Sequence, residues 1–414
     1  MPMNIDPLTL DAVKDAARSC FSLTRQIRRD LHQHPELSGQ ESFTSNYLAE
    51  KLTAIGLDVH TGVGGLGLVA NLVTDLTKPT TALRVDMDAL PIQEVNNVDY
   101  RSKINGISHA CGHDVHSAIG VGIAYALTKL KHLLPGNLRI LFQPEEEEIT
   151  GALKMIHAGA LSHPKPRAIF GIHVAPLPVG QIAWTNGLFL AGFDHYLASL
   201  SPQVGTTMST EHLDALCQYC CNTIQKLNQW HLPLNWDQMQ TFWEFMQNGS
   251  SGLQNFIIYE ASLNQDDRDA WHGQFGIGIK AASHHLRKTA VGRIKAALNP
   301  ICQTTRTEFH LETMGRMPDM RNNSDLVLAS LPALKEAIGE QNLIHLKAAF
   351  PFNCEDFSYY TKYIPGAMYW LGAANPKAGK YALLHTPDFD VDERCIETGI
   401  LGMATLIIES LLFS

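Results

Sequence analysis

Short apolar runs alternate with helical patterns along the first half of this chain, and this alternation constrains the fold more than any other feature. The runs are bounded by Gly, Pro or Asn and are rich in branched side chains, as buried strands are. Between them, apolar residues recur at the spacing of one helix face. We expect strands at 66–73, 81–91, 137–144 and 167–176, and helices at 7–32, 41–55, 114–132 and 151–160. This order predicts an α/β fold in which helices layer a sheet.

From about Gly192 the pattern changes to a second kind of unit. A strand-like stretch there is followed by a helical segment at 210–229, a strand at 275–281, a helix at 283–298 and a strand at 307–313. This is close to the β-α-β-β-α-β order of the split βαβ arrangement. We therefore expect a first domain made of residues 1–191 and 315–414, interrupted by an inserted α+β domain at 192–314. A chain of 414 residues also exceeds the size at which one core stops growing.

Composition and charge exclude several classes of protein. Hydrophobic residues make up 45% and charged residues 18%, as in ordinary globular proteins. A net charge of -9, with Lys and Arg scattered, argues against a nucleic-acid partner and against binding to an acidic membrane surface. The first residues lack the pattern of a secretory signal, so we expect a cytoplasmic protein with reduced cysteines. The apolar C-terminal stretch 399–414 is expected to be too short to span a bilayer and to dock as a helix.

The segment HACGHDVH (109–116) supplies the first candidate metal ligands. It places Cys111 and His113 on a Gly-containing loop directly ahead of a predicted helix. Thiolate and imidazole are good ligands for zinc-like ions, and a helix N-terminus helps to keep a thiol deprotonated. The alternative is a buried thiol beside surface histidines, and at this point both interpretations stay open.

The segment FQPEEEE (142–148) places four carboxylates directly after a predicted strand. The carboxyl edge of an α/β sheet is where ligand sites usually lie, although a run of Glu is commonly only a solvated face. Glu146 and Glu147 can divide the chemistry, one binding metal and the other acting as a general base toward water. Spacing does not say which residue has which role.

Two histidines complete the candidate set. His173 ends the predicted strand in GIHVAPLPVG (171–180), and His385 lies in the turn-rich segment LLHTPDFDVDE (383–393). A lone histidine in either place is more commonly structural. The hypothesis of a metal centre rests on the convergence of several metal-type ligands at predicted strand ends.

Together these segments resemble a known family, the metal-dependent amidohydrolases that include aminoacylase-like enzymes, hippurate hydrolase, aminobenzoyl-glutamate hydrolase and the indole-acetyl-amino-acid hydrolases of plants. The likeness covers the four segments above and three more, in the family's order. The three are RRDLHQHPELSGQE (28–41), LRVDMDALPI (83–92) and CEDFSYY (354–360). The resemblance implies a metallopeptidase-like catalytic domain with a mixed sheet flanked by helices. It also implies a ferredoxin-like inserted domain that acts as a lid and forms a homodimer.

The resemblance also implies a role for each candidate residue. Two divalent metal ions per chain are held by Cys111, His113, Glu147, His173 and His385. Glu146 becomes the general base that takes a proton from water and returns it to the leaving amine. Asp86 and Asp88 brace ligands without touching metal. Zinc or manganese are the expected metals, and nickel or cobalt tolerate the same ligands.

The predicted activity is hydrolysis of the amide bond in a small N-acyl amino acid or a related amino-acid conjugate. Its acyl group and amino acid stay open, because the likeness fades in the inserted domain. The family's Gly-Gly-His-Ala-type turn is missing there: Thr207 lies near the expected His and His212 near a later one. Asn264 and Lys280 match only loosely an Asn and an Arg that grip substrate. The segment 228–256, rich in Trp and Gln, has no counterpart.

Two other functions stay open from the sequence. The altered inserted domain allows a divergent member of the family that binds metal and ligand with little or no hydrolysis. A dinuclear metallo-esterase or phosphatase is the other alternative, although the sequence offers no Arg cluster to grip phosphate.

Overall fold

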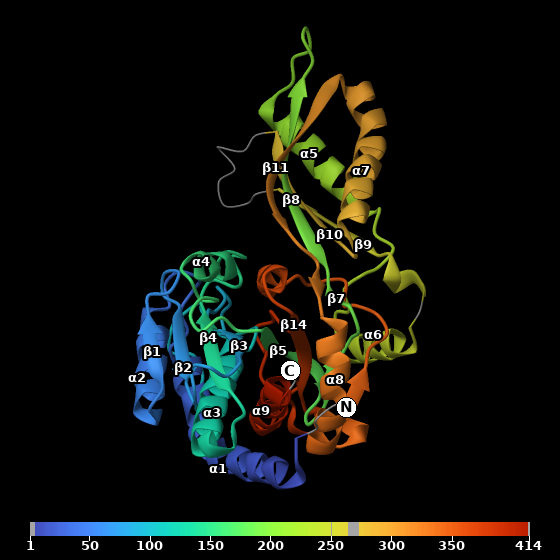
Figure 1. The fold of residues 1–414 in the computed structure, drawn as a ribbon. Helices are drawn as coiled ribbons and strands as arrows, with labels where there is room; N and C mark the ends of the chain where they lie inside the picture. Colours follow the sequence, from blue (N-terminus) through green and yellow to red (C-terminus); the bar gives the residue numbers. More distant parts are fainter. Residues whose placement is uncertain (1–4, 250, 264–272, 413–414) are drawn as a thin grey trace.

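The computed structural model describes residues 5–249, 251–263 and 273–412. Within them, an eight-stranded sheet lies inside the larger part of the molecule (Figure 1). Its strand order is β1-β2-β4-β3-β5-β14-β6-β13. The strands are β1 Asp58–Thr61, β2 Leu68–Leu72, β3 Thr80–Asp86, β4 Asn137–Gln143, β5 Ala168–Pro178, β6 Ile182–Trp184, β13 Leu343–His345 and β14 Gly366–Ala374. Parallel pairs at the centre and antiparallel pairs toward β1 make the sheet mixed. The predicted α/β class is therefore confirmed.

Helices cover this sheet, and α1, α3 and α9 pack against one another. The helices are α1 Pro7–Gln33, α2 Ser42–Ile55, α3 His113–Lys129, α4 Gly151–His157, α8 Ser324–Ile338 and α9 Cys395–Leu412. A Cβ added at Gly122 of α3 would lie 2.3 Å from Ile400 Cδ1, and one added at Gly399 of α9 would lie 2.5 Å from Ile119 Cδ1. The absence of side chains at these two glycines lets α3 and α9 approach each other.

Helix α9 is long and apolar enough to cross a membrane by length and composition, so the expectation that it is too short is wrong. Its burial decides how it is interpreted, because 78% of its residues are buried inside the protein. It packs against α1, α3, α8 and the sheet, and its Glu409 accepts a hydrogen bond from the Ile5 N–H at 2.8 Å. This is the environment of a core helix, in agreement with the predicted docking.

A second, four-stranded antiparallel sheet stands above the first (Figure 1), with the order β11-β8-β10-β9. Its strands are β8 Gly192–Pro202, β9 Ile257–Ser262, β10 Gln274–Ala281 and β11 Thr307–Met317, and helices α5 Thr210–Gln225 and α7 His284–Thr305 pack against it. The predicted β-α-β-β-α-β order is present. The short strands β7 Leu188–Leu190 and β12 Met320–Arg321 pair where the chain enters and leaves this part. The division into domains at 192 and 314 stays a prediction.

Helix α6, Trp236–Asn248, is an element that the sequence did not predict. Asn235 caps its N-terminus, because the Asn235 side chain accepts a hydrogen bond from the Gln238 N–H. Its buried side chains Met239, Trp243 and Met246 join the core of the large sheet and not that of the small one. The chain therefore leaves the small sheet after α5, packs on the large one, and returns to form β9.

The contact between α3 and α9 leads to a prediction about stability. Ile400 is completely buried and its side chain packs against Gly122. Replacing Ile400 by Ala should lower the free energy of unfolding by about 2–5 kcal/mol, because the shorter side chain leaves a cavity there. Urea denaturation followed by circular dichroism measures this loss. Leu8→Ala is the control, since Leu8 is 82% exposed and should change the value by less than about 0.5 kcal/mol. Equal losses in the two variants would contradict this account of the core.

Candidate metal centre

Three neighbouring parallel strands bring the predicted ligands to one edge of the large sheet. Asp86 pairs with Gln143, so β3 and β4 end together and the glutamates that follow β4 begin beside Asp86. Arg84 pairs with Gly171 of β5, which places His173 two residues further toward the same edge. His173 lies inside β5 and not at its end as predicted, because β14 continues to pair with β5 up to Pro178. The predicted strand 81–91 ends at Asp86, which leaves Asp88 in the loop beyond it.

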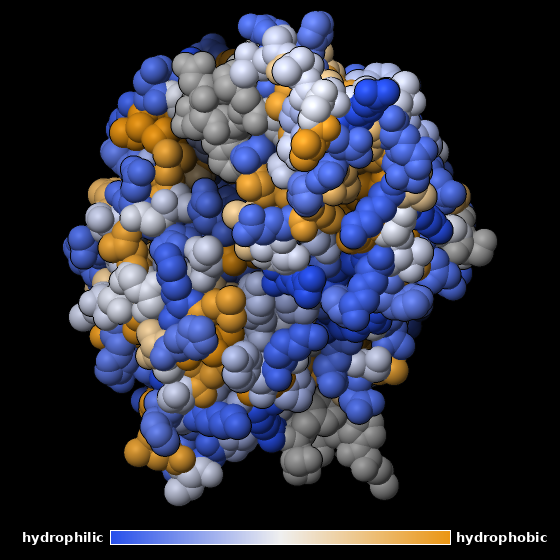
Figure 2. Space-filling view, turned by 90° about the horizontal axis from the view of Figure 1, so that it is seen from above, coloured by the Kyte–Doolittle hydropathy of each residue, from blue (hydrophilic) through white to orange (hydrophobic). Residues whose placement is uncertain are grey.

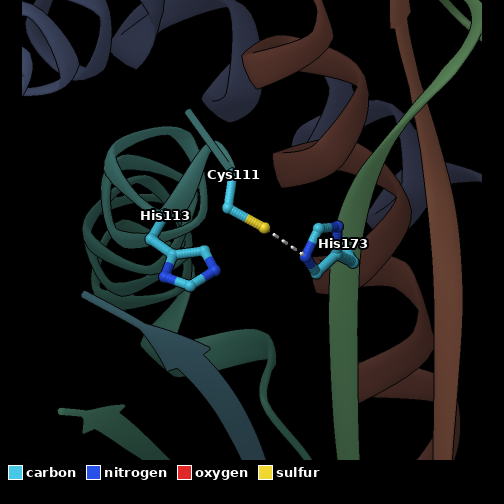
Figure 3. Close-up of side chains that lie close together, drawn as sticks. All are labelled: Cys111, His113 and His173. Atoms are coloured by element: carbon cyan, nitrogen blue, oxygen red, sulfur yellow. Dashed lines mark hydrogen bonds between the residues drawn. The ribbon is translucent and has the colours of Figure 1, made fainter. Parts of the chain in front are cut away.

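The loop before α3 holds Cys111 over this edge, and His113 is the first residue of α3 (Figure 3). Gly112 between them has a φ of 84° and precedes the first residue of the helix. A Cβ at Gly112 would also lie 2.5 Å from Val174 Cγ2, so both the backbone conformation and the space require glycine. Figure 3 shows the Cys111 thiol directed toward His173, with His113 beside it at the start of α3.

The five predicted ligands lie together and form two groups that share Cys111. Cys111 Sγ lies 3.4 Å from His173 Nε2 and 3.2 Å from His385 Nε2. In one group, ligand atoms of Cys111, His113 and His173 lie within 4.8 Å of one another; in the other, those of Cys111, Glu147 and His385 do. Two trios that meet at one thiol form an arrangement suited to two ions.

Two buried atoms of this set support an interpretation as metal ligands. His113 Nε2 and Glu147 Oε1 have no hydrogen-bond partner among the residues that the structure describes. A buried polar atom without a partner is destabilising, so such atoms at a functional site point to a missing group. Imidazole, thiolate and carboxylate together are ligands that divalent transition metals accept. The residues present therefore fit a pair of metal ions.

Neighbouring groups orient the two imidazoles of the first trio. Asp88 Oδ1 lies 3.1 Å from His113 Nδ1, and Asp88 Oδ2 accepts hydrogen bonds from the Ser38 hydroxyl and the Glu147 N–H. His173 Nδ1 donates to its neighbouring carbonyl at Val174. With Nδ1 engaged in both rings, each Nε2 is left available for the centre.

Asp86 supports the site through His116, which in turn holds the backbone at Val174. Its Oδ1 accepts a hydrogen bond of 2.6 Å from His116 Nδ1, and His116 Nε2 in turn accepts one from the Val174 N–H. Because both nitrogens of His116 are engaged, this residue holds the backbone next to His173 and is not free to bind an ion. This geometry is that of a packing residue.

The electrostatics of the pocket favour added positive charge. Burial raises the pKa of the Cys111 thiol well above its usual range, and the carboxylates of Glu147 and Glu146 raise it further. Burial would lower the pKa of His113, but the carboxylates of Asp86 and Asp88 outweigh this and raise it to about 10. Nearby carboxylates contribute to both shifts, and cations would neutralise this buried negative charge.

Glu146 lies beside the ligands with 7% of its surface exposed. Burial raises its pKa well above the usual range, and the nearby carboxyls of Glu355 and Glu147 add to this shift. The chain bends sharply around it, because Glu145 and Ile149 have positive φ values of 55° and 59°. Such conformations are uncommon outside glycine and are concentrated at functional sites.

Arg84 is the residue of this site that sequence reasoning missed. Its guanidinium is almost fully buried and lies 2.6 Å from Asp86, 3.0 Å from Glu355 and 2.9 Å from Asp356. It is the compensating cation for carboxylates that come from β3 and from the segment after Cys354. The signal was present as an Arg two residues before Asp86 on a buried strand, where an unpaired charge is not tolerated.

A cavity of about 1110 Å³ opens above the ligands and reaches the small sheet. Its lining includes Lys280 of β10, whose Nζ lies 2.6 Å from Glu260 Oε1. Thr207 and His212 are exposed and are not among the lining residues, and Asn264 lies outside the described residues. Seen from above, hydrophilic residues cover most of the surface and hydrophobic ones lie in small separate groups (Figure 2).

A fold of this kind with paired ligand trios and a buried glutamate beside them defines a metal-dependent hydrolase, and comparisons with known proteins give its family. Residues 82–409 match the model of peptidase family M20/M25/M40. The chain is 31% identical to a probable hydrolase of Synechocystis, covering 95% of this chain and 96% of that protein. It is also 31% identical to IAA-amino acid hydrolase ILR1-like 2 of Arabidopsis thaliana, covering 94% and 86%.

A solved structure gives the same result. The Bacillus subtilis YXEP protein, described as a dinuclear metal binding peptidase from the M20 family, matches with a TM-score of 0.71 at 25% identity and covers 95% of this chain and 99% of that one. The chain therefore belongs to peptidase family M20/M25/M40, and it is a metal-dependent amide hydrolase.

The burial of Arg84 leads to a second prediction. Replacing it by Met should lower the free energy of unfolding by about 3–5 kcal/mol, because three buried carboxylates lose their compensating charge. Urea denaturation measures the change, with Arg18→Met as the control. Arg18 is 67% exposed in its side chain, and its loss should change the value by less than about 1 kcal/mol. An unchanged free energy of unfolding in Arg84→Met would show that the carboxylates are compensated in another way.

Glu41 leads to a prediction about pH. Its Oε1 accepts a hydrogen bond from the Glu145 N–H, its Oε2 has no partner among the described residues, and burial raises its pKa from 4.5 to about 7. The folded state thus holds a proton that the unfolded state has released, so stability should fall as pH rises from about 4.5 to about 7. Glu41→Gln removes this titration. Denaturation across that range should show the variant gaining stability relative to wild type; a constant difference would contradict the shift.

Proposed function

We propose that this protein hydrolyses the amide bond of a small N-acyl amino acid or a related amino-acid conjugate. The observation that carries the proposal is the pair of ligand trios meeting at Cys111 directly beside the buried Glu146. Cys111, His113, Glu147, His173 and His385 would hold two divalent ions, zinc or manganese by the character of the ligands. When bound, the ions supply a water of lowered pKa and polarise the carbonyl of the scissile amide.

Glu146 is the general base of the proposed reaction. It takes a proton from the attacking water as the water oxygen bonds to the carbonyl carbon. It then delivers this proton to the amide nitrogen as the C–N bond breaks, so that a carboxylic acid and an amine leave. A carboxylate that is buried beside the ligands and faces the cavity is placed for both transfers.

The substrate class rests on the cavity and on a relative. The cavity of about 1110 Å³ is closed in by residues of both sheets, which suits a small molecule rather than a folded protein. The Arabidopsis relative is named as a hydrolase of an amino-acid conjugate. The proposal also keeps residues 192–314 as a lid or dimerisation domain of a homodimeric, cytoplasmic enzyme.

Metal content and amine release test the proposal together. Wild type should contain about two ions per chain by plasma mass spectrometry, as two-metal hydrolases do, and His113→Ala should contain fewer. Glu146→Gln should keep its metal and lose hydrolysis of N-acyl amino acids by a factor of about 100–10,000, measured as amine released to ninhydrin. The exposed neighbour Glu148 provides the matched control, because Glu148→Gln should keep both metal and activity.

Two outcomes would contradict this function. Full hydrolysis by Glu146→Gln would remove the assigned base. A metal-loaded wild type that releases no amine from any conjugate would instead favour a protein that binds metal and ligand without turnover.

A further inference from the structure

The segment 228–248, called the strap below, connects the two sheets across the side of the cavity. At its start the Asn228 side chain exchanges hydrogen bonds of 2.9 and 2.8 Å with the backbone carbonyl and N–H of Tyr259 on β9. Toward its end Gln240 Nε2 donates to the Pro176 carbonyl on β5 at 2.9 Å. Buried Trp243 stacks on Phe350 in the core of the large sheet. The strap is thus fixed at both ends.

Trp230 of the strap is held in one place. Its ring centroid lies 5.3 Å from that of Phe245 and 6.4 Å from that of Phe242. On another side, a Cβ added at Gly252 would lie 2.7 Å from Trp230 Cζ2, so the indole rests directly on the backbone there. An aromatic side chain fixed in this way forms a preformed wall, since little entropy remains to be lost when a ligand contacts it.

The cavity that contains the candidate ligands is also lined by Trp230 and Leu232 of the strap and by Phe352 and Trp370, which pack in the core of the large sheet. The apolar lining reaches the candidate metal centre, because the ring centroid of Trp370 lies 5.6 Å from that of His173. Leu232 completes it with 49% of its surface exposed, although it faces the cavity. Apolar surface that stays exposed in a pocket gains free energy when an apolar ligand covers it.

We propose that the strap forms a subsite for a bulky apolar group of the substrate, with Trp230 and Leu232 as specificity-determining residues. The inference rests on the proposed function for the reaction, and it adds the chemistry of the substrate. The apolar group belongs either to the acyl part or to the side chain of the amino acid, since both offer the same surface to the strap. The lining also includes Asn222 and Lys226, which offer polar groups to the remainder of the conjugate.

Specificity ratios test the subsite. The ratios are kcat/KM for N-acetylphenylalanine over N-acetylglycine and for N-benzoylglycine over N-acetylglycine, which separate the amino-acid side chain from the acyl group. At least one ratio should favour the bulky substrate in wild type. That ratio should fall about ten-fold in Trp230→Ala and about three-fold in Leu232→Ala, because apolar contact is lost only by the bulky substrate.

Trp236→Ala is the matched control. Trp236 is an aromatic residue of the same strap whose ring lies 6.2 Å from Tyr381, and it is not among the lining residues. Its removal should leave both ratios unchanged, and Trp230→Phe should restore most of the preference. Leu232→Ala keeps the test decisive if Trp230→Ala fails to fold, since the half-exposed Leu232 contributes little to the core.

The failure of this inference can be told from the failure of the proposed function. If wild type turns over these substrates but shows no preference, or if both strap variants keep the wild-type ratios, the subsite is overturned and the hydrolase stands. If wild type releases no amine, the subsite is tested by calorimetry, which measures how tightly metal-loaded Glu146→Gln binds the same ligands. Tighter binding of the bulky ligand that is lost on adding Trp230→Ala supports the subsite, and equal binding overturns it.

Discussion

The burial of negative charge at one edge of a parallel sheet is the constraint on which this structure depends. Carboxylates from the ends of β3 and β4 and a thiol from the loop before α3 share a space with little access to water. Charges of one sign are buried only when cations compensate them. Arg84 compensates on one side of Glu146, where Asp86, Glu355 and Asp356 meet. On the other side, His113 Nε2 and Glu147 Oε1 have no hydrogen-bond partner among the described residues, and in the proposed function metal ions take the compensating role there.

Hydrogen bonds and close packing hold the candidate ligands in place. Asp88 hydrogen-bonds to Nδ1 of His113, and the Val174 carbonyl accepts a hydrogen bond from Nδ1 of His173. Gly112 allows the loop to lie against Val174. The large core beneath, with α3 and α9 in close contact through Gly122 and Gly399, supports the sheet edge from below. Catalytic groups held in this way need little rearrangement during a reaction.

The strap gives the cavity a second fixed side. The chain could pass from α5 to β9 without leaving the small sheet, yet its aromatic residues pack on the large one. Phe242 and Trp243 contact Phe350, which ties the walls of the cavity to the same core that carries His173 and Trp370. Chemistry and substrate recognition therefore depend on one continuous body of packed side chains.

Local pattern was enough to predict the sheet class, most helices and the candidate metal-type residues, because helix and strand periodicity and ligand chemistry can be recognised in short segments. The roles of Glu146 and Glu147 came from the family resemblance and not from their spacing. Strand ends were misjudged where pairing with a distant strand decided them, as for His173 in β5 beside β14. Helix α6 was missed because its apolar face is complementary to a core formed by other segments. The sequence by itself determined which groups are available. Only the tertiary structure decided that Cys111 is shared by two trios, that Arg84 meets Asp356, and that Trp230 enters the cavity, since these contacts join residues far apart in the chain.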